Sequence, residues 1–168
     1  MSLPEPPILL ISDRKRTKGP LVQDLRAAVD GGCRWIMLRE KDLPEDELSD
    51  LVRQVQSALA NTQVSLLVNA APNIVAACGL AGVHLPAAQS VAAARQGLGP
   101  SALIGHTAPR HAAVLRAADE GADYATISPI FDSISKVDTR ESLGSAQLRA
   151  IAAASPIPVI ALGGVAST

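Results

Sequence analysis

The sequence predicts an α/β protein built on a parallel β-sheet, and three observations support this. Short apolar runs alternate with Ala-rich helical segments along the chain of 168 residues. The apolar runs are continuous, which is typical of strands that are buried on both faces. Repeated strand–helix units form either a doubly wound sheet or a (β/α)8 barrel. Ser12, Asp13 and Arg14 follow the first strand in place of a Gly-x-Gly-x-x-Gly motif, which disfavours a dinucleotide-binding fold.

We expect seven strands and six helices in regular alternation. The predicted strands cover residues 8–12, 35–39, 64–69, 82–85, 103–107, 124–130 and 158–163. The predicted helices cover residues 20–31, 45–60, 72–79, 90–97, 109–120 and 145–154. Helix 45–60 has the clearest pattern, because its apolar residues recur at helical spacing and three acidic residues follow Pro44 in its first turn. Gly31, Gly32 and Gly121 are typical of helix ends.

Length and composition favour one globular domain over residues 1–168, since 48% of the residues are hydrophobic. A net charge of -1 and three aromatic residues argue against binding to nucleic acid. No apolar run reaches the length of a membrane span, and the N-terminus lacks the features of a signal peptide. Cys33 and Cys78 have no metal-binding spacing and indicate free thiols in a reducing compartment. We therefore expect a cytoplasmic protein.

Seven strands are one fewer than a closed (β/α)8 barrel contains. An eighth strand and its helix would lie beyond Thr168, so the sequence predicts a C-terminally short barrel if the sheet is of that type. The first and seventh strands would then have unpaired edges. A tail beyond Thr168, a rearranged terminus or a second copy of the chain in a homo-oligomer would each cover these edges.

Charged residues follow the second strand, at the end where parallel barrels place their chemistry. The apolar run 35–38 continues directly into Arg39, Glu40 and Lys41. Strand alternation would put Arg39 and Lys41 on the same side, and two cations there suit an anion. The plain alternative is a strand that leaves the core with solvated charges.

The ends of the sixth and seventh strands predict a phosphate site. Ser133, Ser135 and Lys136 follow the sixth strand, and they offer two hydroxyls and one ammonium group to an anion. Gly163 and Gly164 follow the seventh strand, where glycine lets backbone N–H groups approach an anion closely. Late loops of barrels commonly bind phosphate.

Six sequence motifs follow one another along the chain: Leu-Leu-Ile-Ser-Asp, Leu-Arg-Glu-Lys-Asp, Leu-Leu-Val-Asn, Gly-Val-His-Leu, Pro-Ile-Phe with Ser-x-Ser-Lys, and Ala-Leu-Gly-Gly-Val. In these motifs and their order the chain resembles the thiamine phosphate synthase and TenI-like family. The resemblance implies a (β/α)8 barrel and a role in thiamine biosynthesis. Synthases of the family are transferases that join hydroxymethylpyrimidine pyrophosphate to thiazole phosphate and release pyrophosphate, with Mg²⁺ on the pyrophosphate. TenI-like members are isomerases that tautomerise a thiazole carboxylate phosphate.

The resemblance also implies which residues bind the two phosphorylated ligands. Arg39 and Lys41 match the cations that bind pyrophosphate, Asn69 matches an asparagine after the third strand, and Thr107 replaces a serine after the fifth. The residues that match the family's thiazole phosphate site are Ser133, Ser135, Lys136, Gly163 and Gly164.

The chain departs from the family pattern where the synthases bind Mg²⁺. Ala70 replaces the acid after the third strand, and the loop 86–89 after the fourth strand lacks its acid as well. No Asp or Glu occurs anywhere from residue 51 to residue 118. Because Mg²⁺ requires hard oxygen ligands, the implied cofactor lacks its usual carboxylates here. Asp132, in the loop after the sixth strand, is the candidate substitute.

The histidine of TenI-like members also has no direct counterpart, since Pro109 stands at its position. His106, three positions earlier, is the candidate for a general acid or base, whereas His111, two positions later, opens a predicted helix and is expected to be solvated. However, alternation puts His106 and Thr107 on opposite faces of the fifth strand. Three hypotheses therefore stay open: a synthase-type transferase, a TenI-like isomerase, and a non-catalytic relative that binds phosphate esters.

Overall fold

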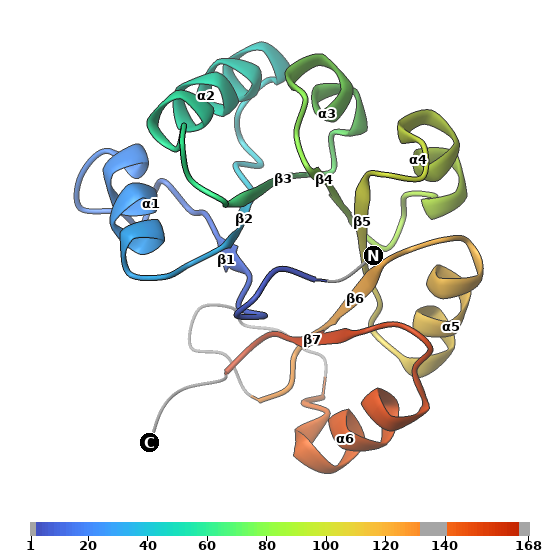
Figure 1. Ribbon diagram of the computed structural model, residues 1–168. Helices are drawn as coiled ribbons and strands as arrows, with labels where there is room; N and C mark the ends of the chain where they lie inside the picture. The colour runs from blue at the N-terminus through green and yellow to red at the C-terminus, as the bar shows by residue number, and fades with distance from the viewer. Residues whose placement is uncertain (1–2, 132–140, 165–168) are drawn as a thin grey trace. The chain divides into compact units, whose positions relative to one another are not determined.

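The computed structural model describes residues 3–131 and 141–164, in which seven strands alternate with six helices (Figure 1). The strands are β1 (Leu10–Ile11), β2 (Trp35–Leu38), β3 (Ser65–Asn69), β4 (Gly82–Leu85), β5 (Leu103–Thr107), β6 (Tyr124–Ile127) and β7 (Val159–Ala161). The helices are α1 (Leu21–Asp30), α2 (Glu45–Ala58), α3 (Pro72–Cys78), α4 (Val91–Leu98), α5 (His111–Asp119) and α6 (Gly144–Ala154). The predicted order of elements is confirmed, and the predicted strands 8–12, 124–130 and 158–163 were too long.

The chain divides into two compact units. Unit 1 comprises Met1–His84 and Gly97–Leu103, and unit 2 comprises Leu85–Gln96 and Ile104–Thr168. Strand pairing within each unit is parallel, and neighbouring strands follow the order of the chain. Chain order is the order of a (β/α)8 barrel, whereas a doubly wound sheet reverses its order at a switch point. The single domain over residues 1–168 stays a prediction.

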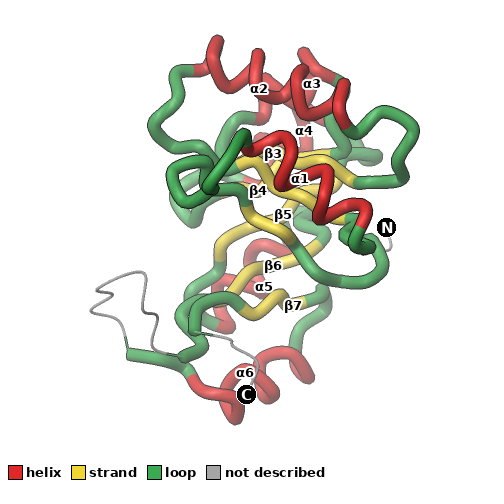
Figure 2. Tube along the Cα trace, turned by 90° about the vertical axis from the view of Figure 1, so that its left-hand side faces the viewer, coloured by secondary structure: helices red, strands yellow, loops and turns green. Residues whose placement is uncertain are grey.

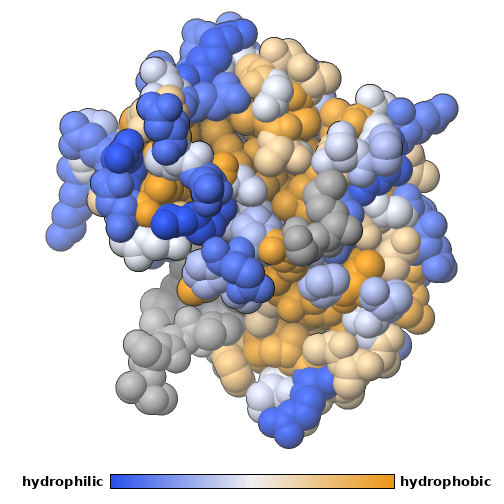
Figure 3. Space-filling model, in the orientation of Figure 1, coloured by the Kyte–Doolittle hydropathy of each residue, from blue (hydrophilic) through white to orange (hydrophobic). Residues whose placement is uncertain are grey.

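Strand β2 forms the centre of unit 1. All four of its residues are buried, and it pairs with β1 on one side and β3 on the other. Helices α1, α2 and α3 lie on one side of these strands (Figure 1). Helix α2 turns Leu48, Val52 and Val55 inward, as the predicted apolar stripe requires. Hydrophilic residues gather on the outer surface over α1 and α2 (Figure 3).

Unit 2 has its own hydrophobic core between β6 and the helices α5 and α6. Strands β6 and β7 lie side by side with α6 next to them (Figure 2). Ala125 and Ile127 of β6 are buried in one cluster with Val114 of α5, and partly buried Leu148 and Ile151 of α6 pack against it. Since strand side chains alternate, Tyr124 and Thr126 face the other side of β6.

The cysteines and the helix lengths bear on the predicted reducing compartment and the predicted lack of a membrane span. Cys33 and Cys78 are both free, and both are half-buried. Among the described residues, no helix has the length and apolar character that a membrane span requires.

Candidate functional site

The ends of β1 and β2 bring Ser12 next to Arg39 and Glu40. The two strands are parallel neighbours, and Ile11 lies opposite Met37. The Ser12 hydroxyl donates a hydrogen bond to Oε1 of Glu40 at 2.6 Å and accepts one from the Arg39 backbone N–H at 2.9 Å. Ser12 therefore holds the backbone where the chain leaves β2, at the first of the two cations predicted to bind an anion.

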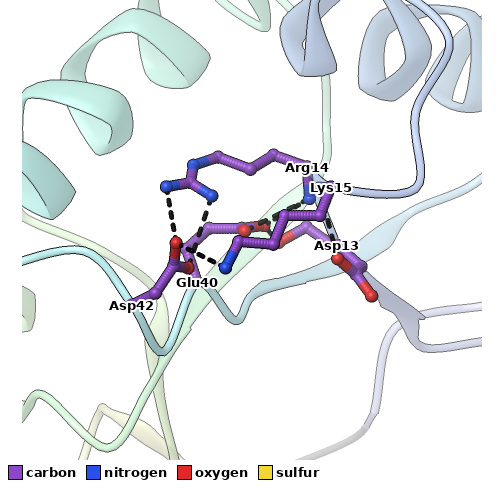
Figure 4. A network of polar contacts seen from close by, with 6 residues as sticks. Asp13, Arg14, Lys15, Glu40 and Asp42 are labelled. Carbon is purple, nitrogen blue, oxygen red and sulfur yellow. Dashed lines mark hydrogen bonds and ion pairs between the residues drawn. The ribbon is translucent and has the colours of Figure 1, made fainter.

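Glu40 is a buried carboxylate that also holds the loop between β1 and α1. It is 5% exposed, and the backbone N–H of Arg14 lies 3.2 Å from each of its oxygens (Figure 4). Hydrogen bonds to an ionised group are among the stronger ones in proteins, and a buried carboxylate needs them. Glu40, which follows β2, thus holds the Ser12 side chain and the Arg14 backbone, which both follow β1.

Asp42 lies at the exposed edge of this network. The Arg14 guanidinium donates Nη1 to Oδ1 of Asp42 at 3.3 Å and Nη2 to Oδ2 at 2.8 Å. Lys15 Nζ lies 2.9 Å from Oδ2, and both cations point at the one carboxylate, whereas Asp13 points away (Figure 4). Hydrogen bonds lower the pKa of Asp42 to about 2, with the larger contribution from Lys15 and the smaller from Arg14. Asp42 is therefore an anion held by two cations.

The structure corrects the predicted end of the second strand. Strand β2 ends at Leu38, one residue earlier than predicted, so regular alternation does not extend to Arg39 and Lys41. Instead Glu40 is buried between a half-buried Arg39 and an exposed Lys41. Arg39 and Lys41 therefore flank Glu40, which accepts hydrogen bonds from Ser12 and Arg14. Strand alternation does not decide the side on which the two cations lie.

Asn69 ends β3 as predicted and lies opposite His84 of β4. The next residue, Ala70, has a φ of 63° and donates its N–H to the His84 carbonyl at 2.9 Å. This left-handed conformation is uncommon for alanine, and Asn and Asp adopt it more readily. Position 70 thus has a backbone conformation that Asn or Asp would adopt more readily than the alanine found there.

The described residues do not fit the Mg²⁺ site that the family resemblance implies. Within residues 3–131 and 141–164, no group of three or more His, Cys, Asp or Glu side chains is arranged to hold a metal. Glu40 and Asp42, the acids after β2, already accept hydrogen bonds from Ser12, Arg14 and Lys15. Asp132, the candidate substitute, lies outside the described residues.

The loops after β6 and β7 meet in unit 2. The backbone N–H of Phe131 donates to the Gly163 carbonyl at 3.0 Å. A Cβ atom at Gly163 would lie 3.1 Å from Cα of Pro129, and both Gly163 and Gly164 have positive φ, at 89° and 67°. Glycine is thus required at position 163, because the loop after β6 approaches the backbone there closely. Ser133, Ser135 and Lys136 lie outside the described residues, so their part in the phosphate site stays a prediction.

Thr107 and His106 lie on opposite faces of β5, as alternation predicts. His106 is opposite Ala125, whose side chain belongs to the core under α5, whereas Thr107 pairs with Thr126 on the other face. His106 is 9% exposed, and in the part of the chain that the structure describes its Nδ1 has no hydrogen-bond partner. Burial lowers its pKa, which a hydrogen bond with the Gln89 backbone partly offsets. This placement favours a structural role, and a catalytic one stays a prediction.

Acidification is expected to destabilise the protein through His106. The pKa of His106 lies below 6.5 in the folded chain. At pH values between this lowered pKa and 6.5, the unfolded chain therefore binds more protons than the folded one. The free energy of unfolding should therefore fall as the pH drops below about 6.5, by at most about 1.4 kcal/mol per pH unit from this group. Urea unfolding from about pH 7 to about pH 5 measures it. His106→Gln should flatten the curve, and an unchanged slope would contradict the assignment.

Four functional candidates escaped the sequence reasoning: Ser12, Arg14, Lys15 and Asp42. Ser12 had a usable signal, because it directly follows a strand that neighbours β2. The other three lie in loops, and no sequence pattern says which loop cation reaches which loop acid. Glu40 was noticed only as one of three charges, without the buried role that it has.

Comparison with known proteins decides the family. The family model described as thiamine monophosphate synthase matches residues 8–168. The chain belongs to this family. The thiamine-phosphate synthase of Methanoculleus marisnigri is 36% identical over 160 residues, which cover 94% of this chain and 76% of that protein. The thiamine-phosphate synthase of Haloquadratum walsbyi is 35% identical over 160 residues, or 93% of this chain and 72% of that protein.

A solved structure of the family has the same fold. The thiamine phosphate pyrophosphorylase from Pyrococcus furiosus matches with a TM-score of 0.81 and 25% identity over 94% of this chain and 74% of that one. The predicted family and the barrel-type α/β fold are thus both confirmed.

Proposed function

We propose that this member of the thiamine monophosphate synthase family acts in thiamine biosynthesis as a transferase. It would join hydroxymethylpyrimidine pyrophosphate to thiazole phosphate and release pyrophosphate. The observation that carries the proposal is the bonded end of β2, where Ser12 and Glu40 fix the backbone beside Arg39 and Lys41. Two cations are thereby presented at a strand end, where an anionic leaving group can be bound.

The chemistry that these residues supply is electrostatic. When the bond from the pyrimidine to pyrophosphate breaks, negative charge grows on the departing group, and nearby fixed cations lower the energy of that state. The guanidinium of Arg39 suits two phosphate oxygens at once, and Lys41 adds a point charge. Because Glu40 and Ser12 already hold this backbone, little reorganisation is needed at the moment of reaction.

The other ligand is assigned to the strand ends of unit 2. Backbone N–H groups at Gly163 and Gly164 suit a phosphate, because glycines of positive φ expose the main chain. Ser133, Ser135 and Lys136 would complete the thiazole phosphate site as the family motif implies. Asn69 is assigned to the pyrimidine, and Thr107 to the substrate-binding face of β5.

Arg39→Gln is expected to lower kcat/KM for thiamine phosphate formation by about 100-fold, as loss of one preorganised donor to a developing anion does. The assay supplies both substrates and measures thiamine phosphate, once with Mg²⁺ and once with EDTA. Arg53→Gln is the matched control, since Arg53 lies exposed on α2 and pairs with Asp50 of the same helix.

Absence of product from the unaltered chain in both conditions would overturn the transferase proposal. Thiazole phosphate binding without turnover would then identify a non-catalytic phosphate-ester-binding relative. Isomerisation of thiazole carboxylate phosphate in the same preparation would instead identify a TenI-like isomerase.

A further inference from the structure

We propose that Arg14 and Lys15 form, with Arg39, a metal-independent site for a pyrophosphate group, and that Asp42 occupies this site as an exchangeable counter-ion. The inference rests on the proposed function, because it assigns further residues to the pyrophosphate end of the same reaction. It concerns unit 1 alone.

The first line of support is local charge. The whole chain has 15 Lys and Arg against 16 Asp and Glu. The loops 12–20 and 39–44, which follow β1 and β2, instead hold six cations, Arg14, Lys15, Arg16, Lys18, Arg39 and Lys41, against three acids, Asp13, Glu40 and Asp42. A local excess of positive charge at neighbouring strand ends attracts anions.

The second line of support is the way Asp42 is held. A guanidinium fork and an ammonium group converge on its carboxylate, with Nη2 of Arg14 at 2.8 Å and Nζ of Lys15 at 2.9 Å (Figure 4). The same set of donors recognises phosphate oxygens. Glu40 fixes the Arg14 backbone through bonds of 3.2 Å, so these donors are positioned before a ligand arrives. The Asp42 carboxylate therefore stands where an anionic ligand would bind.

Solvent exposure decides whether Asp42 or Glu40 can be displaced from its cations by a ligand. The side chains of Arg14, Asp42 and Lys15 are 32%, 39% and 67% exposed, and ion pairs so open to water contribute little net stability. Pyrophosphate carries more charge and more acceptor oxygens than one carboxylate, so it competes well for these donors. Glu40, at 5% exposure and with bonds to Ser12 and Arg14, is retained. Asp42 is thus the anion that exchanges.

The third line of support is the composition of the ends of β3 and β4. Ala70 follows β3, and residues 86–89 after β4 include no acid, so these positions bring no carboxylate to hold a cation on pyrophosphate. Negative charge on the ligand still has to be balanced. In this chain the side chains of Arg14, Lys15 and Arg39 supply that balance directly.

The test is titration calorimetry of the full chain with inorganic pyrophosphate, in EDTA and in Mg²⁺. We expect binding in EDTA, with an affinity that Mg²⁺ does not raise. Arg14→Gln and Lys15→Gln should each weaken binding roughly tenfold, since each removes a charge-assisted contact. Asp42→Asn should tighten it by roughly threefold to tenfold, because the internal competitor is neutralised. Asp50→Asn, the matched control, removes the same charge from exposed α2 and should change nothing.

Binding that requires Mg²⁺ would overturn the inference, and so would an Asp42→Asn variant with unchanged or weaker affinity. Circular dichroism checks that each variant is folded. If Arg14→Gln does not fold, Lys15→Gln carries the test. Product formation together with unaltered pyrophosphate affinity in Arg14→Gln and Lys15→Gln would reject this site and leave the transferase proposal standing. The expected binding pattern without any product would reject the transferase proposal and leave the site.

Discussion

Replacing Glu40 with alanine should lower the free energy of unfolding by about 2–4 kcal/mol, because it leaves two donors in a buried place without their acceptor. The donors are the Ser12 hydroxyl, 2.6 Å from Oε1, and the Arg14 backbone N–H, 3.2 Å from both oxygens. Water cannot easily replace the carboxylate, since Glu40 is 5% exposed and Ser12 is 3% exposed. Urea unfolding followed by circular dichroism measures the loss.

Two control variants make this result specific. Glu40→Gln keeps the carbonyl oxygen as an acceptor and should lose clearly less stability than the alanine variant. Glu47→Ala removes an exposed acid from the first turn of α2 and should change stability by no more than about 0.5 kcal/mol. If the Glu40 and Glu47 alanine variants lost the same small amount, the network would not have the structural role assigned to it.

Replacing Gly82 with alanine is expected to cost about 3 kcal/mol or more, because overpacking here meets main chain rather than a movable side chain. A Cβ atom on Gly82 would lie 1.9 Å from the carbonyl oxygen of Leu103 and 2.6 Å from its carbonyl carbon. Leu103 cannot move aside freely, since its own N–H donates to the Ala81 carbonyl at 2.9 Å. The variant should therefore unfold at much lower urea concentration, or fail to fold at all.

The same substitution at Gly97 gives the matched control. Gly97 lies near the end of α4, is exposed, and a Cβ atom there would meet nothing within 4 Å. Alanine has the higher helix propensity, so Gly97→Ala should stabilise the protein by about 0.5–1 kcal/mol. A Gly82→Ala variant as stable as the original chain would show that the strand position tolerates a side chain.

Much of the fold was predictable because the patterns that specify it are local. The apolar stripe of α2 repeats at helical spacing, and acidic residues mark its start, so helix 45–60 is found at 45–58. The strands were recognisable because apolar residues predominate in short runs such as β2 and β4, and the structure buries every residue of these two strands. Strand ends were less predictable, since β6 stops at Ile127 although apolar residues return at Pro129 and Ile130 after Ser128.

The residues of the candidate site were likewise predictable only in part. Arg39, Lys41 and Asn69 were identified because they follow or end apolar runs, and in a parallel sheet such positions collect at one edge. The role of Glu40 was not predictable, because a one-residue difference in where β2 ends decides which of three consecutive charges turns inward. His106 is the opposite case, since alternation alone predicted that it faces away from Thr107.

The α/β class, the succession of strands along the chain and the family could be predicted from the residues alone, since local periodicity and short motifs carry that information. Which charges pair with one another depends instead on the three-dimensional fold. Asp42 and Arg14 are 28 residues apart in the chain, and their pairing depends on the paths of two loops and on the parallel register of β1 with β2. Those paths are set by long-range contacts such as the Glu40 network, which no local pattern encodes.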